Sequence, residues 1–256
     1  MFYKGMSYGQ VLKSLGKTVS NSVTVTIPEG YELRQIGEIL EKKNVCSAEE
    51  FFKAAEEEYK DYPFLKEIKD RENPLEGYLF PDTYNFEIGQ APRDVIRVML
   101  DNFSNKAYKE YLKSNTDKTL DEIIIMASII EREAANDNER GKVSSVFYNR
   151  LKIGMLLQSC ATVQYIIKER KDVLSNKDIK IDSPYNTYMY EGLPIGPIAS
   201  PGLGSIKAAI FPEDTDYFYF AATKDGERNV FSKTGEEHLK TVKELQGWEI
   251  GLKTTI

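Results

Sequence analysis

The 256-residue sequence contains one histidine, two cysteines and no long apolar run. With His238 alone, a zinc site built from several histidine and cysteine ligands cannot be assembled. Cys46 and Cys160 lie far apart without metal-type spacing, so we expect two thiols that are not joined by a disulfide. The longest apolar run, Ile123–Ile130, is interrupted by Ser128 and is far shorter than the roughly 18 apolar residues that span a bilayer.

An excess of positive charge is also absent. Lys and Arg number 34 and Asp and Glu number 40, which gives a net charge of −6 and argues against nucleic acid as a partner. The N-terminal sequence MFYKGMSYGQ lacks the basic start and apolar core of a signal peptide. Hydrophobic residues at 41% and charged residues at 29% are typical of a folded soluble protein and exclude a disordered chain.

The N-terminal part of the chain has the pattern of a small α+β module. The alternating sequence VTVTI at Val23–Ile27 predicts a strand, and PEG after it predicts a turn. Apolar residues at helical spacing predict a helix that begins at Leu33 and ends near Asn44. Ser47 and Glu50 form a capping box for a second short helix. This βαα unit, with a further strand to complete it, contains no reactive pair and is typical of a packing or binding module.

Changes in composition predict three parts of the chain. We expect the small module in residues 1–60, a charged and solvated connection in residues 61–73, and a larger domain in residues 74–256. The larger domain begins with PLEGYLFPDTYNF, whose prolines and aromatic residues predict an ordered loop with short extended pieces. The chain is therefore expected to be α+β, with a module followed by a larger mixed domain.

The larger domain is expected to surround one buried helix. Thr119 and Glu122 form a capping box before an apolar run that reaches Ile130 and has no polar face. A long loop rich in proline and glycine starts at Ser183, and loops of this kind are usually functional. The strand pattern at 215–223, a DGE turn and NVFS predict a C-terminal β-hairpin.

Glu131 is the first candidate for a catalytic residue. Steps back along the predicted helix lead to Ala127, Ile124 and Leu120, so Glu131 continues an apolar stripe. A carboxyl group in such surroundings is desolvated, and desolvation favours the protonated form that a general acid needs.

The alternative is structural. The helix could reach the surface near this point, with Glu131 paired to Arg132, Arg140 or Arg150. Glu133 lies on the other side of the helix and is expected at the surface.

Other polar candidates have structural explanations that are at least as good. Glu76 and Asp82 could supply a second carboxylate, but acidic residues in loops more often cap turns. His238 could carry a proton or could form a structural hydrogen bond. Glycine-rich phosphate loops and metal-ligand clusters are absent. The remaining candidates lie near helix ends and could contact either substrate or backbone: Asn149, Arg150, Gln158, Ser159 and Thr162.

Five ordered blocks cover about residues 74–245: LEGYLFPDTY, ASIIEREA, KVSSVFYNRLKIGMLLQSCATVQY, SPYNTYMYEGLPIGPIASPG, and a closing strand followed by EH. Together and in this order they resemble the YceG-like family of endolytic murein transglycosylases. The N-terminal segment VTIPEGYELRQIGEIL is similar to the LysM-like domain of the family over about residues 20–58.

This resemblance implies an enzyme that cleaves the β-1,4 bond between N-acetylmuramic acid and N-acetylglucosamine within peptidoglycan strands. It leaves 1,6-anhydro-muramyl ends, terminates nascent glycans and needs no metal or cofactor. The catalytic glutamate of the family falls on Glu131, the residue that the apolar stripe also indicates. The substrate-binding residues that the resemblance implies are Gln158, Ser159, Asn186, Tyr188, Ser200, Glu76 and His238.

The chain departs from the family pattern at two positions and at its start. Cys160 replaces the aspartate of an S-D-P-T-V block, and Asn229 stands two residues before Phe231 where a histidine is common. Family members usually begin with a cytoplasmic tail and one membrane-spanning helix, which this sequence lacks. We therefore expect an extracytoplasmic portion of a protein that is anchored to the outer face of the bacterial cytoplasmic membrane.

Two rival functions stay open. A muramidase that uses water would need a base such as Asp82 or Glu76 close to Glu131. A non-catalytic scaffold that binds peptidoglycan and recruits synthases would carry the same blocks. Glycan strands are the expected partner in each case, and peptidoglycan synthases could be further partners.

Overall fold

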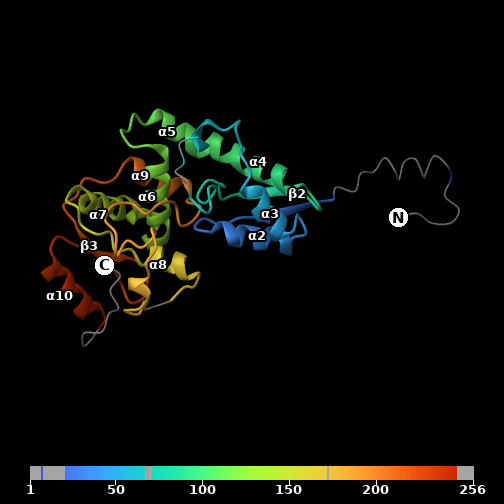
Figure 1. Cartoon of the computed structure of the whole chain (residues 1–256). Coiled ribbons are helices and arrows are strands. Elements are labelled where there is room, and N and C mark those ends of the chain that lie inside the picture. The colour runs from blue at the N-terminus through green and yellow to red at the C-terminus, as the bar shows by residue number, and fades with distance from the viewer. Residues whose placement is uncertain (1–6, 8–20, 67, 69–70, 172, 247–256) are drawn as a thin grey trace.

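A computed structural model of the chain describes residues 7, 21–66, 68, 71–171 and 173–246. Within these residues the fold is α+β, as expected, with helices and two antiparallel two-stranded sheets. Figure 1 shows the N-terminal strands and helices at one end of the molecule and the C-terminal hairpin and helix at the other. Helix α6 lies between them (Figure 1).

The regular elements follow one another in chain order. In the N-terminal half they are β1 (Ser22–Thr26), α2 (Leu33–Lys42), α3 (Ala48–Ala55), a 3₁₀ turn (Pro63–Leu65), β2 (Thr83–Glu87), α4 (Pro92–Phe103), a π-helical turn (Ser104–Tyr108) and α5 (Lys109–Lys113). In the C-terminal half they are α6 (Leu120–Glu133), a 3₁₀ turn (Asp137–Glu139), α7 (Arg140–Lys152), α8 (Cys160–Ile167), a 3₁₀ turn (Asp178–Lys180), α9 (Leu203–Ile210), β3 (Tyr219–Ala222), β4 (Asn229–Ser232) and α10 (Gly235–Gln246).

The strand predicted in the N-terminal module is β1, and its partner comes from much later in the sequence. Val23 pairs with Phe86 and Val25 with Tyr84 in the antiparallel β1–β2 sheet. Val25, Tyr84 and Phe86 are buried, so alternation of apolar and polar residues places one face of this sheet on the core. The sheet thus joins residues on both sides of the connection predicted at 61–73, and the βααβ arrangement is completed by Thr83–Glu87.

The expectation of a solvated connection is wrong for several of its residues. Tyr62 and Phe64 are buried, and the Phe64 ring lies 5.0 Å from that of Phe103 on α4. Arg71 forms a bidentate ion pair with Asp121 in the first turn of α6, at 2.9 and 3.0 Å, and both side chains are buried. The segment is held against the domain by its buried aromatic residues and by this ion pair. The high average charge of the segment did not indicate these individual contacts.

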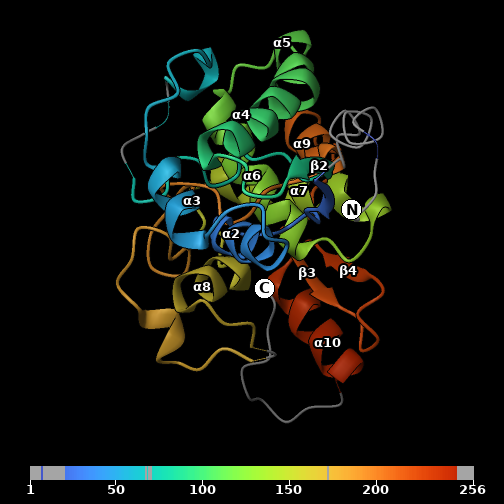
Figure 2. The same ribbon diagram turned by 90° about the vertical axis from the view of Figure 1, so that its right-hand side faces the viewer.

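Helix α6 is buried around its whole circumference, as its apolar sequence predicts. Its residues from Leu120 to Ile130 are buried except for Glu122 in the first turn, and α7, α8 and α9 pack against it. Its predicted capping box is confirmed: Thr119 Oγ1 accepts the Glu122 N–H at 3.2 Å, and Glu122 accepts the Thr119 N–H at 2.8 Å. In Figure 2 the helix lies behind α2 and below α4, and α8 and α10 lie in the lower part of the view.

The predicted C-terminal hairpin is present but its first strand is shorter than expected. Strand β3 pairs with β4 over Tyr219–Ala222 only. The residues before it are held by α7 instead, because Asn149 Nδ2 donates to the carbonyls of Thr215 and Tyr217, each at 2.9 Å. The long loop predicted from Ser183 has no helix or strand of its own before α9.

The two cysteines and the lengths of the helices agree with the sequence. Cys46 and Cys160 are not joined by a disulfide. Burial raises the pKa of the Cys46 thiol to about 11 and that of the Cys160 thiol to about 12. Across the part of the chain that the structure describes, the helices are too short or too polar to cross a membrane.

Removal of the α6 cap should destabilise the fold measurably. In Thr119→Ala the Glu122 N–H loses its acceptor, and we expect the free energy of unfolding to fall by about 1 kcal/mol. Urea unfolding followed by circular dichroism measures this change. Thr119→Ser keeps the hydroxyl and should stay within a few tenths of a kcal/mol of the parent. Equal stability of the Ala and Ser variants would contradict a contribution from the cap.

Candidate active site

Glu131 lies in the last turn of α6, where the buried helix meets polar neighbours. Its Oε2 accepts the backbone N–H of Gly202 at 2.9 Å, and its Oε1 accepts from Arg140 Nη2 at 3.1 Å. The side chain is only 7% exposed. Both sequence interpretations therefore describe part of the site: the carboxyl group is buried, and it also pairs with one of the three arginines that were considered.

Three segments converge on this carboxyl group. Arg140 is the first residue of α7, and a short turn after α6 brings it back toward Glu131. Its Nε donates to Ser205 on α9 at 2.9 Å, which holds the guanidinium group in place. Gly202 precedes α9, so the N-terminus of that helix points at the carboxyl group and stabilises negative charge on it.

The third segment is the PEG turn after β1, and it brings a second carboxylate that sequence analysis did not single out. Glu29 Oε2 lies 3.6 Å from the Arg140 nitrogen that binds Glu131. The carboxyl group of Glu29 also lies against Gly202, where a Cβ atom would stand 1.9 Å from Glu29 Oε1. A glycine is therefore needed at 202 for this approach. Only the glycine and proline beside Glu29 marked the turn in the sequence, and neither indicates a function.

Burial and charge both act on Glu29. Burial raises the pKa of its carboxyl group, and the nearby Glu131 carboxylate raises it further. Arg140 acts in the opposite direction and lowers it. The side chain is 50% exposed, so solvent screens these interactions more than those of Glu131.

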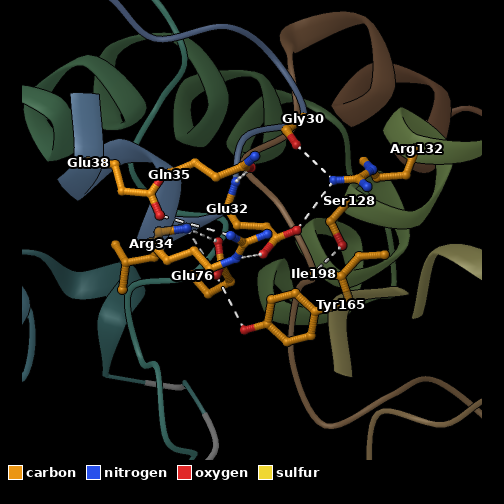
Figure 3. A network of polar contacts seen from close by, with 11 residues as sticks. Gly30, Glu32, Arg34, Gln35, Glu38, Glu76, Ser128, Arg132, Tyr165 and Ile198 are labelled. Atoms are coloured by element: carbon orange, nitrogen blue, oxygen red, sulfur yellow. Dashed lines mark hydrogen bonds and ion pairs between the residues drawn. The ribbon is translucent and has the colours of Figure 1, made fainter. Parts of the chain in front are cut away.

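Arg132 anchors the PEG turn on α6. Its guanidinium group donates to the Gly30 carbonyl at 3.2 Å and lies 3.6 Å from Glu32 Oε1 (Figure 3). Glu32 in turn binds Arg34 Nε at 2.6 Å. Gly30 has a φ of +76°, a backbone conformation that favours glycine. Arg132, the residue after Glu131 on α6, thus holds the turn that carries Glu29.

Glu76 belongs to the same polar network, and Figure 3 shows it between Arg34 and Tyr165. It is buried, accepts the Leu33 N–H at 3.0 and 3.1 Å, and accepts from the Tyr165 hydroxyl at 3.3 Å. Burial raises the pKa of its carboxyl group to about 8. It borders a cavity of about 330 Å³ whose lining includes Glu32, Arg34 and Tyr185.

Asp82, the other acid considered as a base, binds Asn102 and Lys106. The described contacts of Glu131 include neither Glu76 nor Asp82.

The prediction that Glu133 is a surface residue is wrong. Its Oε1 accepts from Ser159 Oγ at 2.5 Å and from the Ala161 N–H at 3.1 Å, so it caps the start of α8. Burial raises the pKa of this carboxyl group. Helical periodicity alone could not show this, because the partner segment comes from elsewhere in the chain.

The predicted binding residues are spread over two sides of the α6 terminus. Ser159, through Glu133, and Tyr188, through a 3.0 Å contact with the Cys160 thiol, lie on the α8 side. Ser200 lies on the Glu131 side, where its backbone pairs with Tyr31.

Two further predicted residues shape loops. Asn186 Nδ2 donates to the carbonyls of Ile179 and Ile181 and thereby organises its loop. Gln158 has a φ of +49° and donates its N–H to the Thr187 carbonyl.

His238 lies away from these groups, on α10. Its ring stacks on Tyr219 with centroids 5.2 Å apart, and it is buried. Its ring nitrogens have no hydrogen-bond partner among the described residues, so the predicted structural hydrogen bond is not found. The neighbouring Arg150 is fully buried and donates to the carbonyls of Leu157 and Phe218, which confirms the structural explanation for that arginine.

Burial of His238 should make the fold sensitive to acid. Burial, and to a smaller extent Arg150, lower its pKa from 6.5 to about 4. The unfolded chain therefore takes up a proton on His238 between about pH 6.5 and pH 4 before the folded chain does, and stability falls as the pH falls through this window. We expect a loss of about 3 kcal/mol from this group, measured by urea unfolding at several pH values.

His238→Phe provides the comparison, because it keeps an aromatic ring against Tyr219 and cannot be protonated. The difference in unfolding free energy between the parent and this variant should shrink or reverse as the pH falls from 7 to 4. Parallel curves for the two proteins would contradict a low pKa of His238.

Comparison with known proteins identifies the family of this chain. The sequence profile of the YceG-like family matches residues 1–244, and the chain therefore belongs to the YceG-like family. A crystal structure of a yceG-like protein from Listeria monocytogenes is similar, with a TM-score of 0.74 and 35% identity, over 92% of this chain and 81% of that one.

Curated relatives carry a common name. The endolytic murein transglycosylase of Bacillus subtilis (strain 168) is 39% identical over 254 residues, which are 93% of this chain and 69% of the relative. The protein of the same name from Streptococcus pneumoniae serotype 2 is 33% identical over 272 residues, which are 94% of this chain. The chain spans about half the length, 49%, of that second relative.

Proposed function

We propose that this protein is an endolytic lytic transglycosylase of peptidoglycan, in which Glu131 is the general acid and base. The observation that carries the proposal is the position of Glu131, a buried carboxyl group at the end of a buried helix, held by one backbone N–H and one guanidinium group. The name shared by the curated relatives supports the reaction class.

In the proposed reaction, protonated Glu131 donates its proton to the glycosidic oxygen between N-acetylmuramic acid and N-acetylglucosamine. The bond from that oxygen to C1 breaks through an oxocarbenium-like state. The carboxylate then accepts the proton of the muramyl C6 hydroxyl while O6 bonds to C1, which yields a 1,6-anhydro end without water. Gly202 N–H and Arg140 would stabilise the carboxylate between these two steps.

Ser200 is the predicted binding residue that we place nearest to the reacting sugars. Its backbone pairs with Tyr31 and accepts the Gly30 N–H. Its hydroxyl is buried and has no hydrogen-bond partner within the described ranges. We propose that His238 is structural. We propose that the other predicted residues act mainly by shaping loops along the glycan path: Gln158, Ser159, Asn186, Tyr188 and Glu76.

We also propose that the N-terminal βααβ unit is a LysM-like module that binds glycan beside the catalytic part. The β1–β2 pairing supports a unit that extends to Glu87, beyond the connection expected at 61–73. Because a murein transglycosylase acts on the cell wall, we place the chain on the extracytoplasmic side of the cytoplasmic membrane, with peptidoglycan synthases as partners in the termination of nascent strands.

A muramidase is the second candidate, and one observation favours it. A hydrolase of this kind needs a second carboxylate to activate water, and Glu29 lies close enough to Glu131 to share Arg140. The two reactions differ in their products, because only hydrolysis incorporates water.

Mass spectrometry of uncrosslinked glycan strands after incubation with the protein tests the proposal. Products with 1,6-anhydro-muramyl ends, lighter by one water than reducing ends, are expected from the parent protein. Glu131→Gln cannot donate the proton and should lower the rate by at least about 100-fold. Glu133→Gln is the matched control, because it changes an acid in the same helical turn and keeps an acceptor for Ser159.

The other outcomes identify the rivals. Reducing muramyl ends would favour the muramidase. Intact strands that still bind to the protein would favour the non-catalytic scaffold. Equal activity of Glu131→Gln and the parent would contradict the role of Glu131.

A further inference from the structure

A cavity of about 330 Å³ lies where the N-terminal βααβ unit meets the rest of the chain. The N-terminal unit lines it with Leu33 and Arg34 at the start of α2 and with Phe52 on α3. The later part of the chain lines it with Tyr165 on α8 and Tyr185 in the long loop that starts at Ser183. Neither part forms the cavity alone. Its volume is at the small end of the range for ligand pockets, about 300 to 1,000 Å³, and suits one small ring.

Two tyrosine rings contribute to the wall of this cavity. The ring centroids of Tyr165 and Tyr185 are 4.9 Å apart, and the ring planes are inclined by 50°. Both side chains are half-buried. Glu76 accepts the Tyr165 hydroxyl at 3.3 Å (Figure 3) and is itself held by the Leu33 N–H at 3.0 Å. The buried Glu76 therefore fixes the position of an aromatic ring that a ligand can contact.

The charges around the cavity nearly cancel. Arg34 binds Glu32 at 2.6 Å, and the two other charged groups of the lining that stay ionised, Glu72 and Lys168, have opposite signs. Burial raises the pKa of Glu76 to about 8, so this carboxyl group is largely neutral at pH 7. A site without net charge favours a neutral ligand over a free anion or cation.

Neutral polar groups complete the lining. Asn73 and Ser183 are half-buried and offer an amide and a hydroxyl as donors and acceptors. Aromatic rings beside such groups match an N-acetylated sugar, which has an apolar C–H face, hydroxyl groups and an acetamido group. We propose that this cavity binds one N-acetylhexosamine residue of the glycan strand, away from the bond that is cleaved at Glu131. This inference rests on the proposed function, because that function makes the glycan the ligand.

The cavity is connected to the catalytic helix through a single acid. Glu32 is part of its lining and lies 3.6 Å from Arg132, the residue next to Glu131. A sugar in the cavity would thus hold the strand at a second point, on the side of the N-terminal unit. Such a contact strengthens the binding of long strands and takes no part in bond cleavage.

The test is binding of the β-1,4-linked tetramer of N-acetylglucosamine to the Glu131→Gln protein, observed by NMR of ¹³C-labelled tyrosine rings. The ring signals of Tyr165 and Tyr185 should shift on binding, whereas those of Tyr219 on β3 should not. Tyr185→Ala should weaken binding about 10-fold, and Tyr185→Phe, which keeps the ring, should bind like the parent. Tyr190→Ala is the matched control, because Tyr190 lies in the same loop, is 47% exposed and is not part of the lining.

A second variant fills the cavity and keeps both rings. Ser183→Leu places a larger side chain in the lining and should also weaken tetramer binding about 10-fold. In proteins that retain Glu131, Ser183→Leu and Tyr185→Ala should raise KM on long uncrosslinked strands and leave kcat unchanged, because the lost contact binds substrate and transition state equally.

The contrary results are distinct. Ring signals of Tyr165 and Tyr185 that do not shift, or equal tetramer affinity of Tyr185→Ala, Ser183→Leu and the parent, would overturn the inference. With Glu131→Gln inactive, either result would leave the proposed function intact. A lower kcat with unchanged KM would make these residues structural and would also overturn the inference. Tetramer binding at the two tyrosines of a Glu131→Gln protein that still cleaves strands would confirm the site and remove the proposed role of Glu131.

Discussion

The burial of α6 on every side is the constraint on which the other features of this structure depend. A helix that is apolar around its circumference must be covered by other elements, and α7, α8 and α9 provide part of that cover. Its charged residues are thereby restricted to its two ends, and in the last turn Glu131, Arg132 and Glu133 leave the helix in three directions. Each reaches a different segment of the chain, so one helix end organises the whole candidate site.

The three contacts have different physical roles. Glu133 caps α8, and Arg132 holds the PEG turn through the Gly30 carbonyl. Glu131 remains for chemistry, with a backbone N–H and a shared guanidinium group as its partners. Rigid neighbours on both sides keep its carboxyl group in one position, which is what general acid–base catalysis requires. The Arg71–Asp121 pair secures the opposite end of the helix.

The sequence predicted those helices and strands that are marked by short-range patterns. The capping box at Thr119 and the C-terminal hairpin depend on neighbours nearby in the sequence, and the alternation that predicted β1 is a local pattern even though its partner strand is distant. The errors have a common cause in distant contacts. Glu133 was expected at the surface because its partner, Ser159, follows 26 residues later. The connection at 61–73 was expected in solvent because its composition does not show that Phe64 packs on Phe103.

The sequence by itself determined the buried helix, the position of Glu131 at its end and the family. Periodicity and motif order are properties of the chain, and they need no knowledge of how the segments pack. Only the tertiary structure decided that Glu29 stands beside Glu131, that β1 pairs with β2 and that His238 lies elsewhere. These arrangements depend on long-range packing, in which a glycine such as Gly202 acts through the side chain that it lacks.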